Sequence, residues 1–348
     1  MSQSRGKNRL GEDNSLAEVE RTALGLRLRG TDLYLEPRGR SELGFLAHAG
    51  AARAILPARL VASAGTIALL EAVQARASVK SASLPATFGK PFALGALRLT
   101  LFPAGHLRGS SQILCEQIEE DAPRLVYSGD LGGAADFACA TAEPREQVEC
   151  DTLILRASYG HPRYLFPPRA EVLAQLSRFV QRTLAARLLP VVLAAPLGGA
   201  QEAAHHLGGE GHTLRLDPTV FRAAEIYQRL GVLLPRIGLL AGVLAFGEVA
   251  ILPYDDRGRR AAAALPAHRS CLLTGRALEP DLPARIGIDE ALPLSDHAGF
   301  DQLIDFALRS GATRVLTIDG YAEDLAHALR QRGIEARALG HQKQLNLF

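Results

Sequence analysis

His48 opens a loop at a place where hydrolytic metal sites are often built. A short apolar strand is expected at Leu43–Ala47, and the loop that follows reads HAGAAR. A His-x-His-x-Asp-His loop after such a strand supplies imidazoles and a carboxylate to a hydrolytic metal centre. Here one imidazole remains, and Gly50, Ala52 and Arg53 stand where the other ligands would be. The loop therefore predicts a metal site that has lost most of its first motif.

Seven further motifs support the interpretation of this loop as part of a metal site. They are, in order, PAGHLRGSSQILCE (103–116), LVYSGDLGG (125–133), LILRASYGHPRYLFPPR (153–169), PLGGAQE (196–202), CLLTGRAL (271–278), LSDHAGFDQLIDF (294–306) and VLTIDGYAEDLAHALRQRG (315–333). Together they resemble the β-CASP branch of the metallo-β-lactamase fold, and most closely the bacterial ligase-associated DNA exonucleases and messenger-RNA 3′-end-processing-like nucleases. The order and spacing of the motifs, over roughly residues 20 to 340, carry this resemblance.

The resemblance implies two divalent ions, and the first would keep three of its four protein ligands. In the family this ion takes both histidines of the His-x-His pair, a histidine of a Gly-His loop and a bridging aspartate. His48, His106 and Asp130 match these positions, and Gly50 does not. Either remaining histidine could instead be structural, for example as a loop histidine that donates to a carbonyl.

The second ion would keep much less. The matching positions are Ala52, Arg53, the shared Asp130 and Asp319, which stands where the family has a late histidine. An arginine cannot be deprotonated to become a ligand, and its guanidinium would place a fixed cation where the ion should sit. We therefore expect that the second site no longer binds a metal ion.

Arg156 also indicates a lost metal site, because the family has a carboxylate at this position, two residues before the Ser/Thr of a Tyr-Gly motif. Carboxylates gathered around an empty metal site repel each other and need a cation. The sequence thus predicts that Arg53 and Arg156 lie near Asp130 or Asp319, where their charges replace lost metal.

Two positions of the cap region complete the comparison. Gly199 replaces a lysine that is common in the family's GKAQE-like loop. Asp296 and His297 match a cap-side Asp-His pair, whose histidine assists protonation of the leaving oxygen in the family, a general-acid role. The resemblance makes these two residues a residual general-acid pair.

The composition excludes several classes of protein. The net charge of +2, with 35 arginines among 39 basic residues, gives no gross basic excess that would indicate nucleic-acid binding. Cys115, Cys139, Cys150 and Cys271 have no pairing pattern and indicate reduced thiols of a cytoplasmic protein. The apolar run 237–252 is interrupted by glycines and a glutamate and is too short for a membrane span, so we expect core there and no membrane partner.

The last residues form a second signal. Gln344, Leu345, Asn346, Leu347 and Phe348 resemble the bacterial sliding-clamp-binding pentapeptide. An extended tail would place the apolar side chains of Leu345, Leu347 and Phe348 in pockets, while the amide of Gln344 fixes the register. The alternative is that the last two residues fold back onto the body.

The fold class implied is α/β: an αββα metallo-β-lactamase sandwich with an inserted parallel α/β cap of the β-CASP type. A strand-rich half ends near Tyr159, and strand–helix alternation follows Pro167. We expect a polar tail at 1–18, the sandwich at 19–166 and 284–340, the cap at 167–283 and a clamp-binding tail at 341–348. Helices are expected at 66–79, 170–188, 201–207, 300–310 and 322–332.

These features predict a catalytically impaired nuclease-like protein of DNA replication or repair that binds rather than cuts. Its expected partners are the sliding clamp, DNA or RNA, and other repair proteins, and its expected cofactor is none or at most one zinc or manganese ion. The alternative is an active one-metal exonuclease that uses His48, His106, Asp130 and Asp319.

Overall fold

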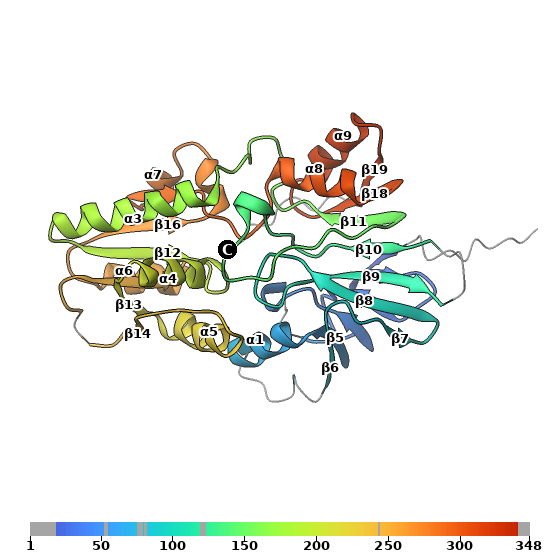
Figure 1. Ribbon diagram of the computed structural model, residues 1–348, viewed down its shortest axis with the longest axis horizontal. Helices are drawn as coiled ribbons and strands as arrows, with labels where there is room; N and C mark the ends of the chain where they lie inside the picture. Colours follow the sequence, from blue (N-terminus) through green and yellow to red (C-terminus); the bar gives the residue numbers. More distant parts are fainter. Residues whose placement is uncertain are drawn as a thin grey trace, which may run out of the picture.

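The computed structural model describes residues 19–51, 55–74, 79, 82–118, 123–242 and 244–339 (Figure 1). Ala52 and Arg53 lie outside the described residues, as do the polar tail 1–18 and the predicted clamp-binding tail 341–348.

Two sheets form the body of the molecule. The first has the order β1-β2-β3-β4-β5-β6, with β1 at Val19–Thr22, β2 at Gly25–Leu28, β3 at Leu33–Leu35, β4 at Leu43–Phe45, β5 at Arg59–Ser63 and β6 at Ser83–Ala86. The second has the order β19-β18-β11-β10-β9-β8-β7, with β7 at Phe92–Leu94, β8 at Leu97–Pro103, β9 at Ser111–Gln117, β10 at Leu125–Tyr127, β11 at Thr152–Arg156, β18 at Arg314–Ile318 and β19 at Glu335–Ala338.

The two sheets pack face to face, and helices cover their outer faces. Leu28 and Phe45 of the first sheet share a buried core with Leu99 and Tyr127 of the second. Helix α1, Ala64–Gln74, packs beside the first sheet, and α8, Phe300–Arg309, and α9, Ala322–Arg330, lie against the second. This αββα arrangement confirms the predicted sandwich.

The cap is a third sheet in which every described strand pairing is parallel. Its order is β14-β13-β15-β12-β16-β17, with β12 at Leu189–Ala194, β13 at Thr213–Leu216, β14 at Ile237–Leu239, β15 at Glu248–Pro253, β16 at His268–Leu273 and β17 at Glu290–Leu292. Helices α3, Arg169–Ala185, α4, Gly199–Gly209, and α5, Pro218–Arg229, cover one face, while α6, Asp256–Ala263, and α7, Leu282–Ile286, cover the other. Burial on both faces explains why the central strands are continuously apolar.

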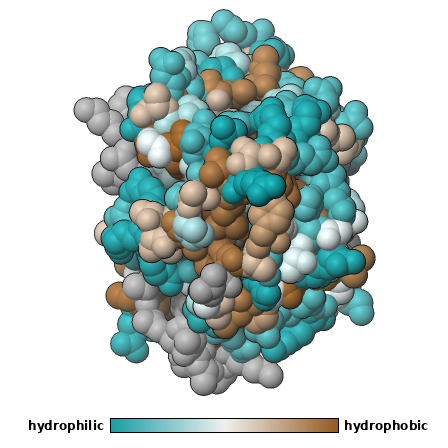
Figure 2. All heavy atoms as spheres, turned by 90° about the vertical axis from the view of Figure 1, so that its left-hand side faces the viewer, coloured by the Kyte–Doolittle hydropathy of each residue, from teal (hydrophilic) through white to brown (hydrophobic). Residues whose placement is uncertain are grey.

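Two expectations need correction. The cap sheet continues past residue 283, because β17 pairs with β16 in parallel, so the expected boundary falls one strand too early. The helix expected at 66–79 begins at Ala64 and is described to Gln74, and residues 75–78 lie outside the described part of the chain. Of the described residues in the apolar run 237–252, only those of β15 are buried, and Leu239 and Phe246 are 44% and 75% exposed. Figure 2 shows apolar side chains at the surface on this end of the cap. No helix within the described ranges is long and apolar enough to cross a membrane.

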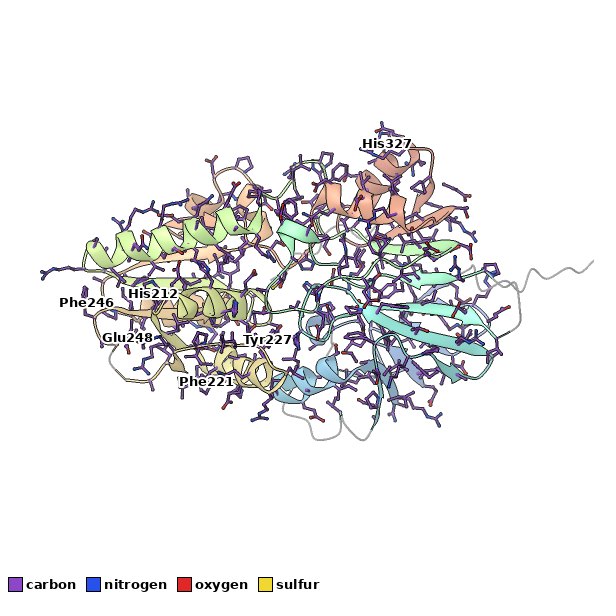
Figure 3. The ribbon with its side chains drawn as sticks, in the orientation of Figure 1. His212, Phe221, Tyr227, Phe246, Glu248 and His327 are labelled. Atoms are coloured by element: carbon purple, nitrogen blue, oxygen red, sulfur yellow. The ribbon has the colours of Figure 1, made fainter. Side chains whose placement is uncertain are left out.

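Cap and body share one apolar core. Helices α1 and α5 lie side by side (Figure 1), and Leu69 and Leu70 of α1 belong to the same buried cluster as Tyr227 of α5. Tyr227, which Figure 3 labels at this junction, also brings its hydroxyl to 3.4 Å from the backbone N–H of Arg108 in the body. The cap is therefore fixed to the body by packing and not only by the connecting segments.

A buried arginine ties the same two parts on the other side. Arg169, at the start of α3, donates to the carbonyls of Ala138 and Ser295, and its Nε lies 3.0 Å from Glu202 Oε1 in α4. Both charged side chains are buried. Burial raises the pKa of Glu202 to about 6, against the opposing effect of Arg169.

Glu202→Gln is expected to remove a pH dependence of stability. The folded chain holds the Glu202 proton more tightly than the unfolded chain. The protonated carboxyl therefore contributes to the free energy of unfolding fully below pH 4.5, and this contribution is lost as the pH rises through about 6. A raised pKa of this size corresponds to about 2 kcal/mol. Denaturant unfolding of the unmodified chain and of Glu202→Gln across this pH range measures the contribution. A difference in unfolding free energy between the two proteins that stays constant with pH would contradict the prediction.

Candidate functional site

Each candidate residue lies at or just after the end of an element, at the edge of the body that faces the cap. His48 follows β4, His106 follows β8, Asp130 follows β10, Asp319 follows β18, Arg156 ends β11, and Asp296 and His297 lie between β17 and α8. Strands that end at one edge bring their following residues together, which is how residues far apart in sequence meet here.

His48, His106 and Asp130 form the centre of the site. His48 Nε2 and Asp130 Oδ2 are 3.0 Å apart, and the His48 and His106 rings meet edge to face with centroids separated by 4.6 Å. One potential ligand atom from each residue lies within 4.8 Å of the others, and all three side chains are buried. Burial lowers the pKa of His106 to about 3, with smaller contributions in the same direction from His297 and His48. His106 is thus a neutral imidazole, the form that coordinates metals.

Asp296 and His297 contact this centre directly. His106 Nδ1 lies 3.2 Å from the backbone carbonyl of Asp296, and the rings of His106 and His297 have centroids 4.3 Å apart. His297 Nδ1 lies 3.4 Å from Asp130 Oδ1. The predicted pair therefore belongs to the same cluster as the predicted metal ligands.

Arg156 lies among three carboxylates. Its Nε is 3.5 Å from Asp130 Oδ1, one terminal nitrogen is 3.3 Å from Asp319 Oδ2, and the other hydrogen-bonds Glu36. Burial by itself would raise the pKa of Asp130, but Arg156, His297 and His48 hold it well below its usual range. The carboxylate is therefore ionised and is neutralised by the protein's own guanidinium, where the eroded motif predicts a cation.

Sequence reasoning missed Glu36 and did not assign a contact to Ser158. Ser158 Oγ donates to Asp130 Oδ1 at 2.8 Å. Glu36, which directly follows β3, accepts a hydrogen bond from Arg156. A glutamate after a three-residue strand has no motif around it, so only the fold reveals this contact. Asp319 adopts a left-handed backbone with φ of 55°, a conformation that aspartate tolerates better than most residues.

Two glycines of the site lie close to other residues of the site. A Cβ on Gly50 would lie 3.1 Å from His48 Nδ1, so a side chain there would require a small shift of the His48 ring. Gly198 precedes Gly199, the position where the family commonly has lysine. Gly198 has φ of +87°, and a Cβ there would lie 2.4 Å from Asp296 Oδ2. The cap loop thus approaches Asp296 closely only because it begins with glycine.

The side chains around Asp130 line a cavity of about 260 Å³, among them those of His48, His106, Arg156, His297 and Asp319. Arg21 of β1 and Arg38, which follows β3, also line it. Arg38 lies 3.6 Å from Asp319 Oδ1. The lining therefore combines imidazoles, carboxylates and arginine side chains, which suits a polar or charged ligand more than an apolar one.

Two overlapping groups of described residues could hold a divalent ion: His48, His106 and Asp130, and His106, Asp296 and His297. Both provide nitrogen and oxygen donors of the kind that zinc and manganese bind. The guanidinium of Arg156 lies beside Asp130 and Asp319. An ion held by the first group would act as a Lewis acid.

Fold and site together define the class: the chain has the metallo-β-lactamase fold with a β-CASP-type cap, and its motifs place it among the relatives of the β-CASP nucleases. It is 32% identical over 324 residues to a probable DNA ligase of Opitutus terrae, covering 93% of this chain and 31% of that protein. It is 28% identical over 152 residues to a ribonuclease of Thermus thermophilus, covering 42% of this chain and 34% of that protein.

A shorter match joins it to an RNase J-like protein of Methanocaldococcus jannaschii, 26% identical over 106 residues, 30% of this chain and 24% of that protein. The chain thus spans about a third or less of the length of these curated relatives. Among solved structures, a protein of unknown function from Enterococcus faecalis shares the fold, with a TM-score of 0.59 and 13% identity over 86% of this chain and 79% of that one. No family model matches the chain.

Proposed function

We propose that this chain is a catalytically impaired β-CASP nuclease-like protein that binds nucleic acid without cutting it. The relatives named as ribonuclease, RNase J-like protein and probable DNA ligase support a function on DNA or RNA. The observation that carries the loss of catalysis is Arg156, held among Asp130, Asp319 and Glu36.

The chemical reason is the missing second ion. Hydrolysis of a phosphodiester by two metals needs one ion on the attacking oxygen and one on the leaving oxygen, about 3.5–4 Å apart. A guanidinium can stabilise negative charge, but it cannot lower the pKa of a bound water to make a hydroxide. The site keeps groups that attract a phosphate and lacks the group that would activate the nucleophile.

The alternative is a one-metal phosphodiesterase that uses His48, His106, Asp130 and Asp319. The compact arrangement of the first three donors favours it. Against it, Asp319 already contacts Arg156 and Arg38 and is not free to position a water.

Purified protein is expected to show no hydrolysis of DNA or RNA that depends on divalent ions. The assay would follow end-labelled single- and double-stranded substrates with added Mn²⁺ or Zn²⁺, beside a binding titration with the same substrates in EDTA. Binding with no cleavage supports the proposal. Robust cleavage that disappears in His106→Ala would establish the one-metal enzyme instead.

We further propose that the protein acts in DNA replication or repair in the cytoplasm, tethered to the sliding clamp through Gln344, Leu345, Leu347 and Phe348. The support is the complete pentapeptide and, independently, the relative named as a probable DNA ligase. A tether of this kind would give a non-cutting protein a defined place on DNA through a local concentration effect.

A further inference from the structure

Asp296 turns one carboxylate oxygen to two imidazoles on the cap side of the site. His106 Nδ1 and His297 Nε2 each lie 3.6 Å from Asp296 Oδ1. One potential ligand atom from each of these three residues lies within 4.8 Å of the others. Ligand atoms on one zinc ion, with bonds of about 2.0–2.2 Å, are separated by about 3–4 Å. The two measured separations therefore suit a single ion that is bound to Oδ1 and to both nitrogens.

The surroundings of Asp296 differ from those of Asp130. The side chain of Asp296 is 12% exposed, and its ion-pair contacts among the described residues are with His106 and His297 and not with an arginine. Its second oxygen, Oδ2, faces the cap loop, where a Cβ on Gly198 would lie 2.4 Å away. Asp130, by contrast, lies 3.5 Å from the guanidinium of Arg156, which would repel a divalent ion bound to that carboxylate. Asp296 can therefore accept a divalent ion without displacing an arginine.

His297 has a carboxylate beside each of its ring nitrogens. Its Nε2 faces Asp296, and its Nδ1 lies 3.4 Å from Asp130 Oδ1. A histidine that binds a metal through one nitrogen usually has its other N–H directed to a carboxylate or a carbonyl, which fixes the tautomer. Asp130 can take this outer role, with the proton of His297 on Nδ1 and the lone pair on Nε2.

His106 can serve only one ion at a time. As a neutral imidazole it carries one proton, which leaves a lone pair on a single nitrogen. Its Nδ1 lies 3.2 Å from the backbone carbonyl of Asp296. An ion on the cap side takes Nδ1 when the proton moves to Nε2, at the cost of the hydrogen bond to this carbonyl. The two groups that share His106 therefore compete for it.

We propose that the chain binds one zinc ion through His106, Asp296 and His297, on the cap side of the site, and not through His48 and Asp130. This proposal does not depend on the proposed function. His106 and His297 also line the cavity of about 260 Å³, so an oxygen of water or of an anionic ligand can complete the coordination from there. The ion thereby ties the segment between β17 and α8 to the loop that follows β8.

The test is zinc binding by the full chain after treatment with EDTA. Zn²⁺ would be titrated against a chromophoric chelator, with metal content measured separately by mass spectrometry. We expect one ion per chain and an affinity at least about tenfold lower in both His297→Gln and Asp296→Asn, since even the loss of an outer partner of a ligand costs about 10–100-fold. His48→Gln separates the two groups, because His48 belongs only to the body-side group, and its zinc affinity should be kept. The matched control is His327→Gln, because His327 is an exposed histidine of α9 on the body, away from the cap (Figure 3).

Loss of zinc in His48→Gln with unchanged affinity in His297→Gln would overturn the proposal and place the ion on the body side. A chain that binds no zinc, or two ions, would also overturn it. If both variants lose zinc, or if either does not fold, anomalous scattering from crystals of the zinc-loaded, unmodified chain decides instead. An ion within bonding distance of Asp296 and His297 supports the proposal, and an ion bonded to His48 and Asp130 contradicts it. These outcomes are separate from the assay of hydrolysis, because they report where zinc binds and not whether nucleic acid is cut.

Discussion

Replacing Arg156 by alanine is expected to lower the free energy of unfolding by roughly 3–5 kcal/mol, the range seen when one partner of a buried ion pair is removed. Without the guanidinium, Asp130, Asp319 and Glu36 lose their shared cation. Two of these carboxylates are largely buried, so water cannot replace the lost charge fully. Denaturant unfolding in EDTA measures the loss under conditions where no added ion can substitute.

The matched control is Arg182→Ala. Arg182 also pairs with a carboxylate, Glu290, but its side chain is 57% exposed. An exposed pair of this kind contributes about 0–1 kcal/mol. Similar losses for the two variants would show that Arg156 is an ordinary surface charge and would remove the main support for a dead second site. Arg156→Lys should recover only part of the loss, because an ammonium cannot reach three carboxylates with the geometry of a planar fork.

Deleting residues 344–348 is expected to abolish binding to the sliding clamp. The pentapeptide is complete, and Phe348 should be its strongest anchor. Truncation of a buried aromatic at an interface costs on the order of 2 kcal/mol or more, which corresponds to an affinity lower by a factor of roughly 30. Titration of the clamp with the full chain, the truncated chain and Phe348→Ala would measure both effects.

Lys343→Ala provides the control, since it alters the same tail without altering the pentapeptide. Its affinity should match that of the full chain, and thermal unfolding of the truncated chain should be unchanged. Equal affinity for full and truncated chains, or no affinity in either, would remove the clamp from the proposal. Loss of stability on truncation would instead indicate that Leu347 and Phe348 pack against the body.

Much of the fold follows from patterns that single elements carry. The helices α3, α8 and α9 lie within a few residues of their predicted ranges, because the helical spacing of apolar residues is strong there. The position of Arg156 beside Asp130 was also predictable, since electrostatics requires a cation near carboxylates that have lost their metal.

The remaining differences have physical causes. Strand β17 has only three residues, too few to show a period, and its place in the cap depends on pairing with β16. Glu36 was missed because its role comes from a contact 120 residues away in sequence. The contact of His297 with Asp130 was missed for the same reason, as it joins the cap side of the cleft to the body. Phe246 is exposed because it lies in the loop between β14 and β15, at the end of the cap away from the body (Figure 3).

The apolar core that continues from α1 into α5 makes the two lobes one thermodynamic unit. Parting them would expose Leu69, Leu70 and Tyr227 to water, at about 1.5–3 kcal/mol for each large apolar side chain. Separation of the cap from the body is therefore unfavourable, and heat should unfold cap and body together in a single cooperative transition.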